Sequence, residues 1–291
     1  MKQKSRNGVR IETKDGQEKV LSLLYGSLAG RVLLKMLTKP VLSKAAGAFL
    51  STGLSCFLIR PFIKKNKIDM RQFEKTRYQS YNEFFSRKIK NGARPIDGTP
   101  EHLISPCDSK LTVLPIRDNT RFTIKNTGYT VASLLKNKNL AAEYANGYAM
   151  IFRLTVDDYH RYCYVDDGAK EENIFIPGVL HTVNPIANDH YPIYKQNSRE
   201  YTLLHSQNFG DIVCMEVGAL LVGKIVNHHE RVRVKRGQEK GHFQFGGSTV
   251  VLLFKAGAVE VDADILENSQ SGYETVVKMG EKIGQKRSVG L

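Results

Sequence analysis

Two segments near the start of the chain carry apolar residues at helical spacing. Residues 19–65 mix leucine, valine and methionine with lysine and arginine at this spacing, and Pro40 and Pro61 interrupt the run. The segment YNEFFSRKIK, residues 81–90, shows the same pattern over a shorter length. We therefore expect amphipathic helices with basic faces in both segments.

From about residue 100 the pattern changes to short runs of β-branched and aromatic residues, separated by Gly, Pro and Asn. Such runs predict strands, and residues 131–144 predict one intervening helix. The expected fold class is α+β, with N-terminal amphipathic helices followed by a mostly antiparallel β core. We divide the chain into a basic helical region, residues 1–97, and a β-rich core, residues 98–291. The predicted strands are residues 110–116, 121–125, 148–154, 173–183, 201–205, 211–226, 231–236, 242–245 and 248–254.

The charge balance points to a polyanionic partner. The 291 residues, enough for one large or two modest domains, include 43 Lys and Arg against 29 Asp and Glu, a formal net charge of +14. Such an excess favours nucleic acid or an anionic membrane surface. No nucleic-acid-binding signature is present, whereas helices both apolar and basic suit a membrane surface. The same helices could simply pack on the core with solvated basic faces.

The cysteines and the apolar segments exclude several classes of protein. Four widely spaced cysteines without a CxxC pair predict neither a zinc site nor a disulfide framework, which favours a reducing compartment. No cluster has metal-ligand spacing, so no metal is expected. The first residues lack the apolar stretch of a secretory signal, and the uncharged segment 45–59 is shorter than the roughly 20 residues of a membrane span. The cysteines are Cys56, Cys107, Cys163 and Cys214.

The segment HFQFGGSTVVLLF, residues 242–254, places two glycines before Ser248. A glycine-containing turn or bulge would explain this triplet. A second interpretation is that the Ser248 hydroxyl attacks the carbonyl of Gly247, where the missing Cβ leaves the approach open. The resulting ester would break by β-elimination and cut the chain. The new N-terminus, a dehydroalanine, would hydrolyse to a pyruvoyl group.

Two further segments contain candidate chemistry. In FRLTVDDYHRYCYVDDG, residues 152–168, His160 lies close to two aspartates and three tyrosines. In LISPCDSKLTVL, residues 103–114, Asp108 follows a proline at a turn that enters a predicted strand. A structural histidine and an ordinary turn aspartate are the plain interpretations of these residues.

Together and in this order, these segments resemble the pyruvoyl-dependent, bacterial-type phosphatidylserine decarboxylase proenzyme family, over nearly the whole chain. SYNEFFSRKIKNGARPID is similar to the family's helix and Arg-Pro element, DDYHRY to its histidine motif, and GHFQFGGSTVVLLF to its cleavage segment. HTVNPIA, NSREYTLLH and MEVGALLVGKI resemble the downstream strands. SPCDSK resembles the aspartate turn, although Cys107 and Ser109 replace the usual small residues around the aspartate.

The resemblance implies an Asp–His–Ser relay for self-cleavage. By position, Asp108 is the relay acid, Ser248 is the nucleophile and pyruvoyl precursor, and His160 is the first motif histidine, beside the pyruvoyl group. Many members have a second histidine where this chain has Cys163, and a thiol with a pKa of about 8.5 is a poor base. His160 could serve both steps, His181 or Cys163 could substitute, or cleavage could be slow. His181 is preferred, because its predicted strand should lie near the site in this family.

The resemblance also implies the products and the reaction. Cleavage between Gly247 and Ser248 would leave a large chain, residues 1–247, and a small chain, residues 248–291, as a heterodimer that could pair into a homodimer. The pyruvoyl carbonyl derived from Ser248 would form a Schiff base with the amine of phosphatidylserine and accept electron density as CO2 leaves. His160 is the candidate acid that protonates the resulting carbon. Hydrolysis then releases phosphatidylethanolamine.

The substrate implies a peripheral protein on the cytoplasmic face of the cell membrane. The expected partners are phosphatidylserine and the anionic membrane surface, not nucleic acid. Three alternatives stay open: a pyruvoyl decarboxylase of a soluble amino acid, a non-enzymatic basic protein, and a serine hydrolase. The membrane-compatible helices argue against the first, and the lack of a G-x-S-x-G elbow before a helix argues against the third.

Overall fold

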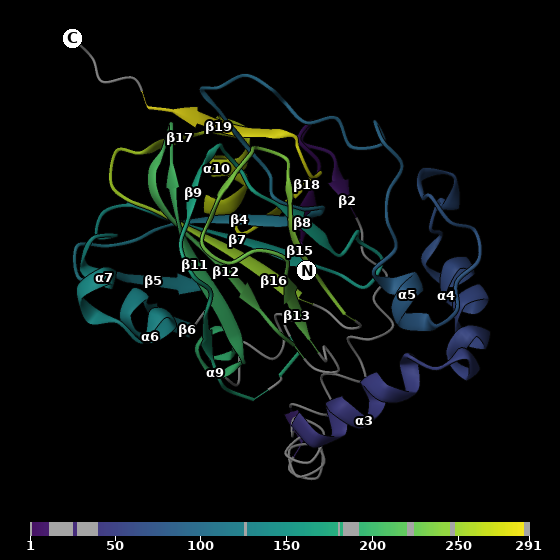
Figure 1. The fold of residues 1–291 in the computed structure, drawn as a ribbon. Coiled ribbons are helices and arrows are strands. Elements are labelled where there is room, and N and C mark those ends of the chain that lie inside the picture. The colour runs from purple at the N-terminus through teal and green to yellow at the C-terminus, as the bar shows by residue number, and fades with distance from the viewer. Residues whose placement is uncertain are drawn as a thin grey trace.

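A large β-sheet runs through the middle of the molecule (Figure 1). The computed structural model describes residues 2–11, 26–27, 40–124, 127–179, 181–182, 192–219, 224–244 and 248–287. Within these residues the sheet has eleven strands, ten in the order β14-β9-β11-β12-β16-β7-β4-β18-β1-β2, with β10 paired to β11. The strands are β14 (Val232–Val234), β9 (Gly168–Lys170), β11 (Arg199–Ser206), β12 (Gly210–Val217), β16 (Ser248–Phe254), β7 (Tyr148–Leu154), β4 (Ser109–Pro115), β18 (Glu274–Val277), β1 (Gln3–Lys4), β2 (Arg10–Ile11) and β10 (Ile174–Ile176).

The strands of this sheet pair antiparallel, apart from β1 with β18. The prediction of an α+β fold with a mostly antiparallel core is therefore confirmed. The division near residue 97 remains a prediction. Residues 3–4 belong to the predicted helical region, yet they extend the main sheet as β1.

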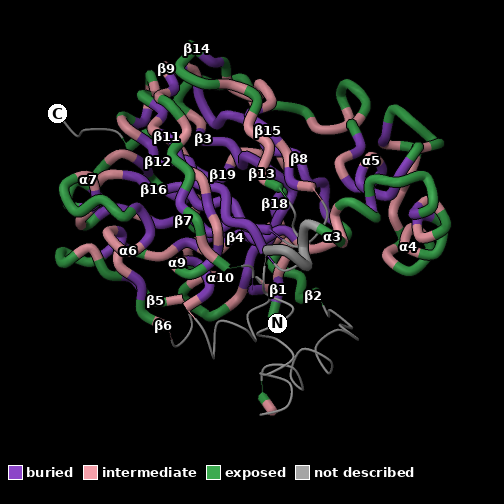
Figure 2. The backbone as a smooth tube through the Cα atoms, turned by 60° about the horizontal axis from the view of Figure 1, so that its bottom comes forward, coloured by how far each residue is buried: buried purple, intermediate pink, exposed green. Residues whose placement is uncertain are grey.

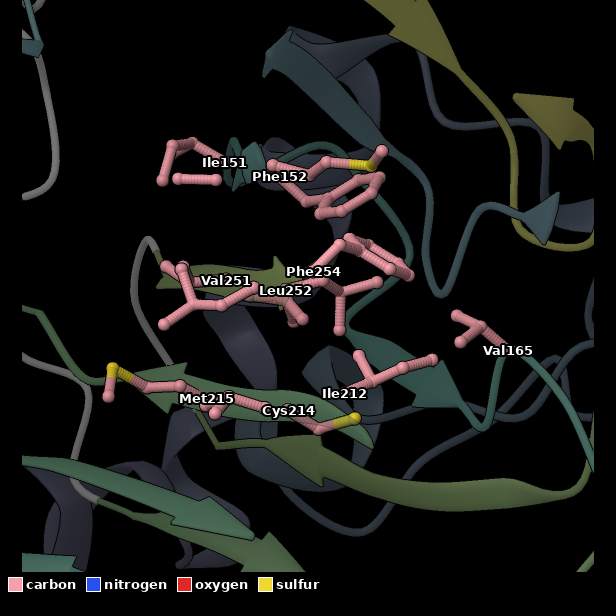
Figure 3. Close-up of a cluster of buried hydrophobic side chains, with 14 of the residues drawn as sticks. Ile151, Phe152, Val165, Ile212, Cys214, Met215, Val251, Leu252 and Phe254 are labelled. Carbon is pink, nitrogen blue, oxygen red and sulfur yellow. The ribbon is translucent and has the colours of Figure 1, made fainter. Parts of the chain in front are cut away.

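The adjacent strands β12, β16 and β7 form the centre of the core. Strand β16 is buried along its whole length, so its sequence STVVLLF shows none of the alternation of a strand that faces water on one side. Figure 2 shows that the neighbouring strands β12 and β7 are buried over most of their length. Side chains from the three strands meet in one apolar cluster (Figure 3), which includes Ile151, Phe152, Ile212, Cys214, Met215, Val251, Leu252 and Phe254.

Smaller sheets and short helices surround this core. One small sheet has the order β13-β15-β8, a second β17-β19-β3, and a two-stranded sheet pairs β5 with β6. Helix α10 (Ala263–Gln270) is tied to β4, because Ser269 Oγ accepts a hydrogen bond of 2.9 Å from the Val113 amide. The strands are β13 (Ile225–Asn227), β15 (Glu239–Phe243), β8 (Arg161–Cys163), β17 (Val259–Val261), β19 (Lys282–Lys286), β3 (His102–Ile104), β5 (Arg121–Ile124) and β6 (Thr127–Thr130).

Most strand predictions for the core hold, with shifted ends. The single strand expected over residues 211–226 was wrong, because β12 ends at Val217 and β13 begins at Ile225. The single helix expected over residues 131–144 was wrong. Two short helices stand there, α6 (Val131–Leu135) and α7 (Lys138–Ala142), because Lys136 adopts a left-handed conformation (φ 54°) and Asn137 caps the second helix. The strand expected over residues 173–183 was also wrong: among its described residues Ile174–Ile176 form β10, and His181 lies in no strand.

The helical part of the chain packs beside one edge of the core (Figure 1). Among the residues described, its elements have a small apolar core of Leu50, Ile59, Tyr81, Phe84 and Phe85. The helix predicted over residues 81–90 ends at Phe85, and the predicted residues 19–25 and 28–39 lie outside the described residues. None of the described helices has the length and apolar character needed to cross a membrane. The elements are α3 (Pro40–Leu50), the 3-10 helix η1 (Gly53–Leu58), α4 (Ile59–Asn66), the 3-10 helix η2 (Met70–Gln72) and α5 (Tyr81–Phe85).

Candidate active site

The fold brings three candidate residues to one end of the main sheet. Ser248 begins β16 and is paired with Leu154, the last residue of β7. Asp108 immediately precedes β4, the strand on the other side of β7, and His160 lies in the loop that follows β7. The backbones of Asp108 and Ser248 are two strands apart, roughly 10 Å. Long-range pairing therefore gathers residues that are far apart in the sequence.

Ser248 is fully buried, and its hydroxyl has no hydrogen-bond partner among the described residues. Most buried hydroxyl groups in proteins are bonded, because losing water without a replacement raises the free energy of the folded state. Gly247 lies outside the described residues. The unbonded Oγ leaves the Ser248 hydroxyl available for chemistry.

His160 is fully buried and is held in one tautomer. Its Nδ1 is 2.9 Å from the carbonyl oxygen of Asp158, and because a carbonyl only accepts, Nδ1 carries the proton. Nε2 therefore keeps its lone pair, and it has no partner within the described structure. The imidazole lies against Phe85, with ring centroids 4.1 Å apart. Burial lowers the pKa of His160 to about 3, so the ring is neutral at physiological pH.

Asp108 is a buried carboxylate held by cations. Arg94 donates two hydrogen bonds to it, of 2.8 and 2.6 Å, and Lys278 Nζ and the Met279 amide donate two more, of 3.2 and 3.0 Å. Burial alone would raise the pKa of Asp108, but the Arg94 hydrogen bonds and the Lys278 charge hold it below its ordinary value. Asp108 is thus ionised, and none of its hydrogen bonds in the described structure goes to His160.

The two candidate substitutes for a second histidine differ in what they can do. Burial raises the pKa of the Cys163 thiol to about 12, so it stays protonated at neutral pH. His181 is buried near β12, since its amide and carbonyl bond to Asn197, whose side chain also bonds to the Gly218 carbonyl. Burial lowers the pKa of His181 as well. Of the two side chains, only the imidazole is suited to accept a proton.

A second cluster, away from Ser248, resembles a metal site but has a competing cation. Donor atoms of His228, Glu239 and His242 lie within 4.8 Å of one another. The Glu239 carboxylate, however, already accepts hydrogen bonds from Arg161, at 2.6 Å, and His228, at 2.8 Å. Because the guanidinium neutralises the carboxylate and repels a cation, we assign no metal to this cluster.

Comparison with known proteins identifies the relatives of this chain. A sequence model of the phosphatidylserine decarboxylase family matches residues 81–285. This chain belongs to that family. It is 50% identical over 273 residues to phosphatidylserine decarboxylase proenzyme 2 of Clostridium acetobutylicum, covering 94% of this chain and 92% of the relative. It is 42% identical over 276 residues to a phosphatidylserine decarboxylase proenzyme of Clostridium botulinum (93% and 94%) and 41% identical over 274 residues to one of Clostridium tetani (92% of each).

The family match covers several residues of the site that motif analysis missed. Arg94 and Lys278 neutralise Asp108. Lys278 is far from Asp108 in the sequence, and Arg94 lies in the Arg-Pro element, to which the sequence analysis gave no role. Phe85, in α5, contacts His160. The sequence placed Phe85 in the segment YNEFFSRKIK but did not predict this contact. Lys110 bonds to Asp158 at 2.6 Å and so steadies the loop that carries His160. These contacts depend on the tertiary fold.

Proposed function

We propose that this chain converts phosphatidylserine to phosphatidylethanolamine and CO2, after cutting its own backbone between Gly247 and Ser248. The observation that carries the proposal is that two buried atoms at one end of the sheet, Ser248 Oγ and His160 Nε2, have no hydrogen-bond partner among the described residues. Each such atom costs about 1–3 kcal/mol of stability. A site that makes and uses a covalent group needs a nucleophile and a proton acceptor that are not engaged elsewhere.

Cleavage would use the chain itself and one water. Ser248 Oγ bonds to the Gly247 carbonyl carbon and gives its proton to a base. The C–N bond then breaks, the base passes that proton to the nitrogen of residue 248, and an ester with a free amine remains. The base then removes the Cα proton of residue 248, the Cβ–O bond breaks, and Gly247 keeps a carboxylate. The dehydroalanine that remains takes up one water and releases ammonia, which leaves the pyruvoyl group.

His160 is the best supported base for this step. The hydrogen bond from its Nδ1 to the Asp158 carbonyl leaves the Nε2 lone pair available, and burial keeps the ring neutral. Asp108 is the proposed acid of the relay, and its low pKa makes it an acceptor of hydrogen bonds. Its ion pair with Arg94 would have to open before it could reach an imidazole. His181 remains the alternative base, and the high pKa of the Cys163 thiol disfavours Cys163.

A pyruvoyl group at residue 248 supplies an electron sink for the loss of CO2 from an amine substrate. Ser248 suits such a group, because its hydroxyl is buried at the start of a fully buried strand and has no partner in the part of the chain that the structure describes. Burial also excludes water from the reacting carbon. His160 is the proposed donor to the substrate carbon, and its Nε2 would first have to take up a proton, because at neutral pH the ring carries only the proton at Nδ1.

The proposed location is peripheral, on the cytoplasmic face of the membrane, and the helical part supports the contact with a membrane surface. Leu54 and Phe57 are 76% and 67% exposed in η1. Exposed basic residues Arg60, Lys64 and Lys65 follow in α4. An apolar anchor beside basic side chains is the combination that binds an anionic bilayer surface.

Two measurements test the proposal together. The intact mass under denaturing conditions should show two fragments, residues 1–247 and 248–291, the smaller one with a blocked N-terminus. The cleaved protein should release CO2 from phosphatidylserine in mixed micelles but not from free serine, whereas the soluble-substrate alternative predicts the reverse. A single uncleaved mass in an active protein would overturn the self-cleavage step. A cleaved protein inactive on phosphatidylserine would overturn the substrate.

A further inference from the structure

Arg87 is a buried cation without a counterion. Its side chain is 2% exposed, and no carboxylate in the described part of the chain forms an ion pair with it. Nη1 makes a long hydrogen bond of 3.3 Å to the Phe84 carbonyl. The guanidinium otherwise lies over the rings of Phe73 and Phe84, 4.3 and 4.8 Å from their centroids. Nε is buried and has no partner among the described residues.

Other buried arginines of this chain are satisfied in ways that Arg87 is not. Arg153 makes two hydrogen bonds to the Glu274 carboxylate, and Arg161 makes one to the Glu239 carboxylate. Arg199 makes four hydrogen bonds to backbone carbonyls. Cation–π contacts stabilise a guanidinium only modestly, while an unpaired buried charge is strongly unfavourable. A ligand anion would account for the unused edge of Arg87.

Arg87 stands beside the candidate active site. Two residues earlier, Phe85 packs on the imidazole of His160. The carbonyl of the intervening Ser86 accepts a hydrogen bond of 2.8 Å from Arg161, which follows His160 in the sequence. The charge of Arg87 also contributes, after burial, to the low pKa of His160. The segment that contains Arg87 thus lies between the helical part of the chain and His160.

We propose that Arg87 binds the phosphodiester of the phospholipid headgroup, an inference that rests on the proposed function. Nε and Nη2 form one edge of a planar fork that matches two oxygens of a phosphate. Nε has no acceptor in the described structure, and the hydrogen bond to the Phe84 carbonyl uses Nη1, which is not on this edge. A phosphodiester is favoured over the substrate carboxylate because the carboxylate is lost in the reaction. A cation bound to it would stabilise the ground state and slow the loss of CO2.

The test compares Arg87→Met and Arg87→Lys with a matched control, Arg121→Met. Arg121 is exposed in β5, on the other side of the molecule from α5 (Figure 1). The substrate is dihexanoyl phosphatidylserine below its micellar concentration, which removes any contribution of a membrane surface. Two inhibitors separate the two anions: glycerophosphoethanolamine has the phosphodiester without the carboxylate, and free serine has the carboxylate without the phosphodiester. Mass spectrometry reports self-cleavage for each variant.

The expected result is a selective loss of phosphodiester binding. In Arg87→Met, the KM and the inhibition constant of glycerophosphoethanolamine rise at least about tenfold, the effect of losing one charge-assisted hydrogen bond or more. Arg87→Lys, which keeps the charge but not the fork, falls between this variant and the wild type. Both variants still cleave, and Arg87→Met unfolds at the same or a higher urea concentration than the wild type, since it removes an unpaired buried charge.

Several results would overturn the inference. One is an unchanged KM in Arg87→Met while the wild type and Arg121→Met are active. Another is a loss of serine inhibition with glycerophosphoethanolamine inhibition intact, which would assign Arg87 to the carboxylate. If Arg87→Met does not fold, an Arg87→Lys enzyme with wild-type inhibition constants would count against a bidentate phosphate contact. Failure of the wild type itself to cleave or decarboxylate would instead overturn the proposed function.

Discussion

Arg153 and Glu274 form a buried ion pair, in which two guanidinium nitrogens bond to the two carboxylate oxygens at 2.8 and 2.6 Å. Arg153 lies in β7 and Glu274 in β18, with β4 between them. The pair therefore joins parts of the chain on opposite sides of the proposed cleavage point. It ties the residues of the expected small chain to the sheet that holds them.

Breaking this pair from one side should destabilise the protein strongly. Arg153→Met leaves the Glu274 carboxylate buried without a cation, which we expect to lower the free energy of unfolding by about 3–5 kcal/mol. Urea denaturation monitored by circular dichroism measures the change. The double variant Arg153→Met/Glu274→Met removes both charges and should recover most of the loss. A double variant as unstable as the single one would contradict this account.

The low pKa of His160 predicts that stability falls in acid. In the unfolded chain the imidazole binds a proton below about pH 6.5, but in the folded protein only below about pH 3. The unfolded state thus binds more protons between these values, and this one group lowers the free energy of unfolding by up to about 1.4 kcal/mol per pH unit. Above pH 6.5 His160 is unprotonated in both states, so it does not make the free energy of unfolding depend on pH.

Urea denaturation from pH 7 to pH 4 tests this dependence. The comparison uses Ser248→Ala with and without His160→Gln, so that neither protein can cleave at Ser248. Gln keeps an N–H donor for the Asp158 carbonyl but does not titrate. Burial is the chief cause that lowers the pKa of His242 to about 4. His242 therefore also lowers the stability in acid, but it does so in both proteins. Equal pH slopes in the two proteins would show that His160 does not titrate as the structure implies.

The self-cleavage rates of three variants should distinguish the three candidate bases. His160→Ala should slow cleavage by at least about 100-fold, the usual effect of removing a general base. Cys163→Ala should cleave at nearly the wild-type rate, because a thiol with a pKa of about 12 is protonated at neutral pH. Denaturing gels of proenzyme sampled over time give the rates. Normal cleavage of His181→Ala would end the hypothesis that His181 replaces the second motif histidine, and normal cleavage of His160→Ala would reject His160.

Membrane binding should depend on the basic residues of α4. Lys64→Gln/Lys65→Gln should bind anionic vesicles roughly thirtyfold more weakly, at about 1 kcal/mol for each lysine. The control Lys136→Gln/Lys138→Gln removes the same charge from the residue that ends α6 and the residue that begins α7, on the other side of the molecule (Figure 1). Vesicle sedimentation at low and high salt measures both. Salt-insensitive binding, lost instead in Leu54→Ser/Phe57→Ser, would assign the binding to apolar insertion.

Much of the fold was predictable because the period of apolar positions is a local property of the chain. The strands around Met150, Leu203 and Leu252 were found in this way, and so was the change from helical to β patterning near residue 100. The helix expected over residues 131–144 failed, because a left-handed residue at Lys136 ends the first of two short helices. The strand expected at His181 failed because apolar residues in a run do not by themselves provide a neighbour to pair with.

The sequence by itself determined the motifs and their order, and through them the resemblance to the family, which implies the candidate roles of Asp108, His160 and Ser248. Motifs and their order depend on residue type and spacing along the chain, which the sequence states directly. Only the tertiary structure decided the state of each group: Asp108 ionised between Arg94 and Lys278, and His160 neutral against Phe85. Charge state and tautomer depend on burial and on neighbours from distant elements, so they cannot be read before the chain is folded.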